Sequence, residues 1–304
     1  ARPRKLVPAS MSVLAHKWVS SGALGGSADF ARARVGVVLH GILGTGRNWM
    51  APAKKLVQSV PGVKVLLVDL RCHGASRVAG APHTVEACAE DVAATLRAAV
   101  GAQAPTPSTP CATSADAGAA FVVGHSFGGK VALAYAAQRA AKGLEAPRHT
   151  LLVDSVPGAS RAVQTGVDGV IEALAAAAAD EPFASRAEAT RALEAKGLDA
   201  ATAAWLASAV EQRDGGFHFQ HDVPGIVALY DAYRDTDLWH VAHDLAADGS
   251  FALLTAGKNP APWAPWRADL DRLGAHGAHF TAPESGHNVH VDNLPRVVSL
   301  LVDH

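Results

Sequence analysis

Five residues in the middle of the chain, Gly124-His125-Ser126-Phe127-Gly128, have the pattern G-x-S-x-G. The pattern follows an apolar run at 121–123 and precedes a stretch of strong helix formers at 129–141. A serine in a tight turn from strand to helix is held in a strained backbone conformation, with its oxygen clear of the carboxyl end of the strand. We therefore expect Ser126 to be a nucleophile. An ordinary strand–helix turn with a serine N-cap is the structural alternative.

Two further segments would supply the groups that a serine nucleophile needs. The segment His40-Gly41-Ile42-Leu43-Gly44 follows an apolar run. The backbone N–H of Ile42, together with that of Phe127, would form an oxyanion hole with two donors. His287 follows the last predicted strand in a loop opened by a glycine, and histidine is the usual base for a serine. His290 is close by, but His287 is preferred because it stands at the strand end.

The acid that would orient the histidine has two candidates. Leu152-Val153-Asp154 ends an apolar strand and keeps the chain order serine, acid, histidine. A carboxylate at Asp154 would fix the tautomer of His287 and stabilise its charged form. A turn-capping aspartate before Pro157-Gly158 is the structural alternative at this position. Asp222, near the junction of a loop and a predicted helix, is the second candidate for the acid.

Aromatic side chains gather in or near a predicted helical block. They would either line an apolar acyl pocket or form the core of the block. The candidates for the substrate pocket are Trp49, Phe217, Tyr230 and Trp239.

Metal and disulfide chemistry are not expected. Histidine pairs spaced by three residues occur, but they lack cysteine partners and an H-E-x-x-H frame, so no metal site is predicted. Cys72, Cys88 and Cys111 are too few and too widely spaced for a disulfide framework or a zinc ribbon. We expect three free thiols in a reducing compartment.

The spacing of apolar residues predicts alternating strands and helices. This alternation favours an α/β protein, with a mostly parallel sheet and helices on both faces. The predicted strands are 35–39, 63–68, 121–123, 151–153, 251–255 and 279–281. The predicted helices are 84–100, 129–141 and 295–302, the last capped by Asp292 or Asn293.

Two segments interrupt the alternation and suggest the domain organisation. Residues 159–240 are predicted to be consecutive helices with no clear strand before 217–220, so they would form a helical cap inserted between core segments 31–158 and 241–304. Residues 102–118 contain three prolines and few large apolar residues, which predicts a mobile loop insertion.

Composition excludes some functions and suggests a location. The chain has 304 residues and a formal net charge of −1, which argues against a nucleic-acid binder that depends on a basic surface. Hydrophobic residues make up 49%, yet no run approaches the 18 apolar residues of a membrane span.

Residues 1–30 form a basic N-terminal extension, with no acid before residue 29. It is interpreted either as the remainder of a transit peptide, for a chloroplast or else a mitochondrion, or as a flexible end of a cytoplasmic protein. Secretion is not expected.

These motifs resemble those of the α/β-hydrolase superfamily, from about residue 35 to the C-terminus. More narrowly, the chain is similar to the branch of α/β-hydrolase-domain-containing protein eleven, in its plant and green-algal form. The segments that carry the resemblance are LHGILGTGRNW (39–49), VDLRCHGAS (68–76), VVGHSFGGK (122–130), VDSVPG (153–158), GIVALYDAYRDTDLW (225–239) and SGHNVHVDN (285–293). The resemblance implies an α/β-hydrolase fold and a Ser/His/acid hydrolase without a cofactor.

Two classes of function are compatible with these features. The first is a serine carboxylic-ester hydrolase, esterase-like, lipase-like or a thioesterase, acting on a small-molecule acyl ester or lipid through Ser126, His287 and Asp154. The second is a small-molecule receptor or interaction protein that retains the fold, because a fold does not fix a function. Acyl transfer or a lyase reaction on the same scaffold is a third, weaker idea. The sequence indicates neither the oligomeric state nor the physiological substrate.

Overall fold

The computed structural model describes residues 12–21, 33–77, 80–102, 118–163, 165–258 and 260–302. Most of the basic N-terminal extension and nearly all of the predicted loop 102–118 lie outside these residues.

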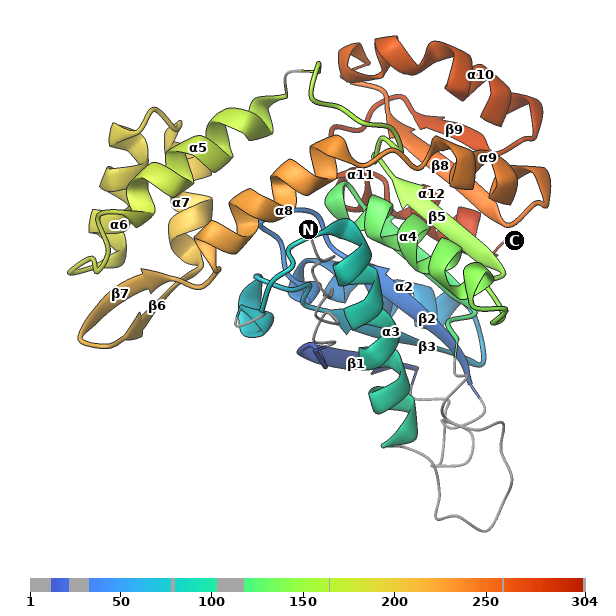
Figure 1. The fold of residues 1–304 in the computed structure, drawn as a ribbon, viewed down its shortest axis with the longest axis horizontal. Coiled ribbons are helices and arrows are strands. Elements are labelled where there is room, and N and C mark those ends of the chain that lie inside the picture. The colour runs from blue at the N-terminus through green and yellow to red at the C-terminus, as the bar shows by residue number, and fades with distance from the viewer. Residues whose placement is uncertain are drawn as a thin grey trace, which may run out of the picture.

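A seven-stranded sheet, with strand order β1-β3-β2-β4-β5-β8-β9, forms the centre of the molecule (Figure 1). The strands after β1 are all parallel to one another. They are β2 (Arg34–Leu39), β3 (Val63–Val68), β4 (Phe121–His125), β5 (His149–Val153), β8 (Phe251–Ala256) and β9 (His279–Ala282). All six predicted strands are present, and the predicted mostly parallel sheet is confirmed.

The edge strand β1 (His16–Ser20) was not predicted. It pairs antiparallel with β3, so that Trp18 lies opposite Leu66. The segment just before β1 is tied to α3, because the amide of Leu14 donates a hydrogen bond of 2.8 Å to the hydroxyl of Thr95. The basic composition of residues 1–30 predicts an extension outside the core. That assignment is wrong for 16–20, because their backbone completes the sheet edge and Val19 is buried.

Helices cover both faces of the sheet and form a hydrophobic core on each. Helices α3 (Val85–Gly101), α4 (Phe127–Ala141), α9 (Trp239–Ala247) and α10 (Arg267–Ala275) pack into one core. Helices α2 (Met50–Ser59) and α12 (Leu294–Val302) pack into the other. The three predicted helices are confirmed. Of the two predicted caps of α12, the side chain of Asn293 takes the role and accepts from the amide of Arg296 at 3.2 Å. Four short helices lie in the loops: η1 (Gly46–Trp49), η2 (Gly74–Ser76), η4 (Ala261–Trp266) and α11 (Val289–Asp292). None of the helices among the described residues is long and apolar enough to span a bilayer.

The segment between β5 and α9 extends from one end of the sheet (Figure 1). It contains α5 (Gly166–Ala178), α6 (Arg186–Ala195), α7 (Ala200–Ser208), β6 (Val210–Arg213), β7 (Gly216–Phe219) and α8 (Val223–Asp235). We call it the cap. A helical cap was predicted, but the cap is not entirely helical. Its strands β6 and β7 form an antiparallel hairpin. The hairpin turn is Asp214-Gly215, with φ of 48° and 84°. Asp-Gly at positive φ is a strong hairpin signal.

Lys130 ties the cap to the core. It lies in the first turn of α4 with its side chain fully buried. Its Nζ donates to the carbonyl oxygens of Gly158 at 2.7 Å, Tyr233 at 2.6 Å and Thr236 at 2.9 Å. Gly158 lies where the chain enters the cap, and Tyr233 and Thr236 lie at the end of α8, where the chain leaves it. One ammonium group therefore holds both ends of the cap. Burial lowers the pKa of Lys130 to about 7, and the charges of nearby aspartates oppose this effect.

We predict that Lys130→Met destabilises the protein. The apolar side chain fills the same space but leaves three carbonyls without a donor, which should lower the free energy of unfolding by about 3 kcal/mol. Urea unfolding followed by circular dichroism measures the change. Lys142→Met, at the exposed end of the same helix, is the matched control and should change stability by less than about 0.5 kcal/mol. Equal unfolding midpoints for the two variants would contradict the anchoring role of Lys130.

Candidate active site

The turn between β4 and α4 leaves no room for side chains on either side of the serine. A Cβ atom at Gly124 would lie 2.3 Å from the Gly128 carbonyl oxygen, and one at Gly128 would lie 2.5 Å from the Leu39 carbonyl oxygen. This close approach puts Ser126 at φ 50° and ψ −118°, a region that non-glycine residues rarely adopt. Ser126 therefore stands at the carboxyl end of β4 as the G-x-S-x-G pattern predicts.

His287 and Asp154 are brought together from the ends of different strands. The ring Nδ1–H of His287 donates to Oδ2 of Asp154 at 2.7 Å. The histidine side chain is 50% exposed and the aspartate side chain 10% exposed. A hydrogen bond at Nδ1 leaves Nε2 as the ring nitrogen that can accept a proton. His287 also lines the same cavity as Ser126.

The carboxylate of Asp154 is held by its neighbours on both sides. Its Oδ1 accepts from the amide of Ala256 at 2.9 Å and from the indole N–H of Trp263 at 3.2 Å. Asp154 itself has a φ of 46°, which turns the chain sharply at the end of β5. Three donors to one carboxylate fix its orientation. The contribution of Trp263 could not be foreseen, since its sequence segment carries no motif.

Asp222, the second candidate for the acid, lies elsewhere. It is the N-cap of α8, where its side chain accepts from the amide of Gly225 at 3.2 Å. Two cavities lie next to Ser126, and Asp222 lines neither of them. The structure therefore brings Asp154, and not Asp222, to His287.

His125 supports the loop that carries His287. Its Nε2–H donates to the backbone carbonyl of His287 at 3.0 Å. Burial lowers the pKa of His125 well below its usual value, so the ring remains neutral. On the other side, the ring of His290 stacks on Trp49 with centroids 4.3 Å apart. The sequence analysis identified His125 as part of the serine motif and Trp49 as a pocket residue, but not these contacts.

Two neutral histidines fix the loop after β2. His40 donates from Nδ1 to the carbonyl of Gly41 at 2.8 Å and accepts the amide of Leu70 at Nε2. His73 donates from Nδ1 to the carbonyl of Arg71 and accepts the amide of Leu43 at 3.0 Å. A protonated ring could not accept either amide. In agreement with this, burial lowers the pKa of both histidines.

The candidate oxyanion donors are the amides of Ile42 and Phe127. The N–H of Ile42 donates to no protein acceptor among the described residues. Phe127 is the first residue of α4, a position whose N–H has no acceptor inside the helix. Both residues line the cavity next to Ser126. The arrangement can therefore direct two backbone donors at one oxygen atom.

Two cavities meet at Ser126. The larger, about 540 Å³, is mainly apolar and lies under the cap. The smaller, about 410 Å³, contains Trp49 and several histidines. Both are lined by Ser126 and His287. The larger cavity is also lined by apolar and aromatic residues that sequence analysis did not single out, Val156, Val163, Val167, Val170, Trp263 and Trp266, and by the polar residues Ser160, Thr165 and Arg234.

Of the four predicted pocket residues, two are misplaced. Tyr230 lines the larger cavity and Trp49 the smaller one. Phe217 instead pairs with Phe183 within the cap and lines neither cavity. Trp239 is buried beside Trp266, with ring centroids 5.9 Å apart, and also lines neither. Both side chains belong to the packing of the cap and its junction, which was the alternative interpretation of the aromatic cluster.

A parallel sheet that presents a serine turn beside a histidine–aspartate pair is the arrangement of the α/β-hydrolase class. Sequence comparison leads to the same class: the chain belongs to the alpha/beta hydrolase family, which it matches over residues 37–300. The predicted α/β-hydrolase fold is thus confirmed.

Individual relatives are more distant. The chain is 37% identical over 103 residues to the sn-1-specific diacylglycerol lipase ABHD11 of Mus musculus. That match spans 34% of this chain and only 28% of the length of the mouse protein.

Solved structures are similar over nearly the whole chain. An esterase from a marine microorganism has a TM-score of 0.66 at 16% identity, covering 95% of this chain and 98% of its own. A thioesterase domain from the curacin biosynthetic pathway has a TM-score of 0.52 at 20% identity, covering 96% of this chain and all of its own. At these identities the likeness shows the fold alone.

We predict that stability falls between pH 6.5 and pH 4. Burial lowers the pKa of His221 and of His290 to about 4 each. In this window the unfolded chain binds more protons than the folded one, so acid favours unfolding, by about 2 kcal/mol per histidine between pH 7 and pH 5. Urea unfolding at the two pH values measures the difference.

Two substitutions separate this effect from other titrations. His290→Gln should reduce the loss of stability between pH 7 and pH 5, whereas His276→Gln, at an exposed position, should not alter it. A loss of the same size in wild type and His290→Gln would show that His290 is not held neutral.

Proposed function

We propose that the protein is a serine carboxylic-ester hydrolase acting on an apolar acyl ester of a small molecule or lipid. The observation that carries the proposal is the 2.7 Å hydrogen bond between His287 and Asp154, in a cavity also lined by Ser126. Membership of the hydrolase family supports it.

In the first half-reaction Ser126 forms the acyl-enzyme. Nε2 of His287 takes the proton of the serine hydroxyl as the oxygen attacks the acyl carbon. The carbonyl oxygen becomes negatively charged and is stabilised by the N–H groups of Ile42 and Phe127. The tetrahedral intermediate then collapses, and His287 gives its proton to the departing alcohol.

In the second half-reaction water releases the acyl group. His287 takes a proton from water, the hydroxide attacks the acyl carbon, and the same two amides stabilise the oxygen again. Collapse expels Ser126, which recovers its proton from His287. Asp154 remains ionised throughout, where it keeps the ring in one tautomer and stabilises the transient imidazolium.

The two cavities suggest how an ester would lie. The larger cavity is lined by valines and aromatic rings, which suit an apolar acyl chain. The smaller cavity has more polar side chains, including His40 and Asn48, and would hold the leaving group. The similar esterase and thioesterase structures are consistent with either an oxygen or a sulfur leaving atom.

The narrower branch and the compartment are also proposals. The motif at 225–239 supports the plant and green-algal branch of protein eleven, and the basic, acid-poor composition of residues 1–28 supports an organelle. A mass spectrum of the N-terminus of the natural protein would test the second proposal. A cytosolic initiator methionine at that end would contradict it.

We predict that a fluorophosphonate probe labels Ser126 and that nitrophenyl esters of increasing chain length are hydrolysed. Ser126→Ala should abolish labelling and turnover. Asp154→Asn should lower kcat by about 10⁴-fold, because the amide favours the wrong histidine tautomer. Steady-state kinetics and mass spectrometry of the labelled peptide make these measurements.

A second His–Asp pair provides the matched control. His243 donates to Asp269 at 2.9 Å outside both cavities, so Asp269→Asn should retain full activity. Full activity of Asp154→Asn would remove Asp154 from the mechanism. Labelling of Ser126 without turnover of any ester would favour the alternative, a small-molecule receptor that retains the fold.

A further inference from the structure

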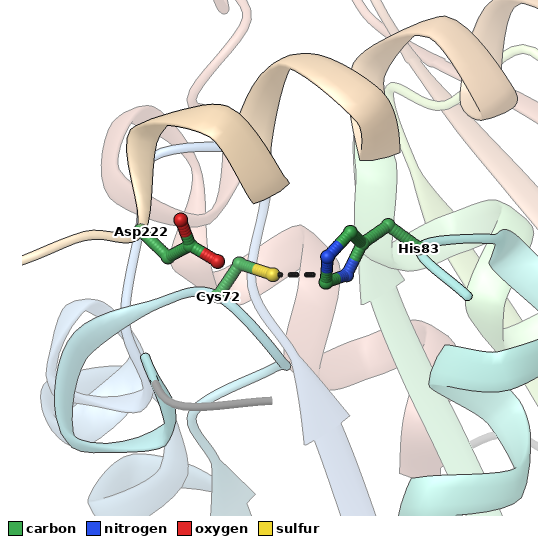
Figure 2. Close-up of side chains that lie close together, drawn as sticks. All are labelled: Cys72, His83 and Asp222. Atoms are coloured by element: carbon green, nitrogen blue, oxygen red, sulfur yellow. Dashed lines mark hydrogen bonds between the residues drawn. The ribbon is translucent and has the colours of Figure 1, made fainter. Parts of the chain in front are cut away.

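Three side chains with metal-binding atoms meet between the core and the cap (Figure 2). Cys72 lies in the loop after β3, His83 just before α3, and Asp222 at the start of α8. The Sγ of Cys72 is 3.4 Å from Nδ1 of His83. The thiol sulfur, a ring nitrogen and a carboxylate oxygen all lie within 4.8 Å of one another. None of the three residues lines the cavities at Ser126.

The backbone holds the cysteine and the aspartate in register. Cys72 has a φ of 66°, and its N–H donates to the carbonyl of Ser76 at 3.1 Å. Its own carbonyl accepts the amide of Asp222 at 2.9 Å. The cap helix therefore begins at a point that is hydrogen-bonded to the cysteine itself.

A buried arginine holds the segment that carries the histidine. The guanidinium of Arg71 forms an ion pair with Asp91 at 2.7 Å. It also donates to the carbonyl of Gly80 at 3.3 Å and to that of Pro82. The guanidinium of Arg71, whose charge is neutralised by Asp91, thus holds the segment just before His83. The ring nitrogen of His83 is directed at the thiol of Cys72 (Figure 2).

Gly225 packs closely against the cluster. A Cβ atom at Gly225 would lie 2.4 Å from Sγ of Cys72 and 2.5 Å from Oδ2 of Asp222. Any larger residue would occupy the volume next to both candidate ligand atoms. The other carboxylate oxygen, Oδ1, accepts from the amide of Gly225, whereas Oδ2 and Sγ of Cys72 lie beside the same point next to Gly225.

The donor set suits zinc, and so does the distance between its sulfur and nitrogen atoms. With Zn–S near 2.3 Å and Zn–N near 2.0–2.1 Å, tetrahedral coordination separates sulfur and nitrogen by about 3.5 Å, close to the 3.4 Å found here. We propose that Cys72, His83 and Asp222 bind one Zn²⁺ ion, with water as the fourth ligand. On binding, the thiol loses its proton to solvent as the sulfur–zinc bond forms. The thiolate and carboxylate then neutralise the charge of the ion.

The ion would cross-link the cap to the core. Two ligands belong to core loops and the third to the first turn of α8, so zinc would join the cap at the end of α8 opposite to the Lys130 anchor. The sequence analysis predicted no metal site, because these three residues follow no ligand spacing along the chain.

Titration of the chelator-treated full chain with zinc or cobalt tests the site. We expect one equivalent of Zn²⁺ to bind, with a rise in Tm of about 5 °C at a hundredfold excess over Kd. Co²⁺ should give the thiolate-to-cobalt charge-transfer absorption in the near ultraviolet and the intense visible bands of tetrahedral cobalt.

Four variants separate this site from adventitious binding. Cys72→Ser and Asp222→Asn should lose the zinc-dependent rise in Tm and the cobalt bands. Asp222→Asn is the sharper test, because asparagine is as good an N-cap as aspartate and α8 should still form. Gly225→Ala keeps all three ligands but should weaken binding, because its Cβ atom would displace the sulfur of Cys72 and Oδ2 of Asp222. Cys88→Ser removes another buried thiol and should leave binding unchanged.

The outcomes that overturn the proposal are specific. Cobalt spectra without a thiolate band, or equal zinc-dependent stabilisation in wild type and Asp222→Asn, would show that metal binds elsewhere on the chain. Absence of binding by the folded wild type would show that the three side chains form only a hydrogen-bonded cluster. Ester hydrolysis is measured separately on the metal-free protein. A failure of the zinc proposal therefore leaves the proposed ester hydrolase function untouched, and a failure of that function leaves the zinc proposal untouched.

Discussion

The turn from β4 to α4 admits no Cβ atom at Gly124 or Gly128, because carbonyl oxygens of the same turn and of β2 lie where these atoms would be. This steric constraint forces Ser126 to a positive φ and directs the first turn of α4 toward the loop after β2. The two candidate oxyanion donors face one cavity as a consequence, since Phe127 begins the helix and Ile42 lies in that loop. The strain at Ser126 is compensated by the packing of α4, whose inward residues are buried in the core of that face.

The loops around this turn are held by histidines that must remain neutral. His40, His73 and His125 are buried, and each orients a backbone group of a loop that contributes to the site. A neutral ring offers one donor and one acceptor, so it can join a carbonyl and an amide at the same time. This explains why so many histidines occur near the site without serving as bases. His287 differs from these three histidines, because it is half exposed and paired with a carboxylate.

The cap is fastened to the core by polar contacts at its two ends. Lys130 satisfies three carbonyls where the chain enters and leaves the cap, and the amide of Asp222 bonds to Cys72 at the start of α8. Between these points the cap contributes mainly apolar side chains to the larger cavity. A substrate chain would therefore lie between a rigid sheet end and a cap whose ends are fixed. The proposed zinc ion would strengthen the attachment near the start of α8, where Arg77 of the core also forms an ion pair with Glu211 of the cap.

Local sequence determined much of this protein. Short runs of β-branched and leucine residues identified the parallel strands, because strands covered by helices on both faces are buried along their whole length. Apolar residues three and four apart identified the main helices. The glycines around Ser126 identified the turn, because only residues without side chains permit that approach. The chain order of serine, acid and histidine pointed to Asp154, and left Asp222 open.

Tertiary structure decided what depends on residues far apart in the chain. The edge strand β1, the indole of Trp263 on Asp154, the lysine that holds the cap and the meeting of Cys72, His83 and Asp222 have no local pattern. In each case the contact forms only after the sheet and cap have folded. The same holds for Phe217 and Trp239, whose large apolar surfaces suit a pocket and a core equally well. Sequence records how much surface a side chain can bury, whereas the packing of distant elements decides where it is buried.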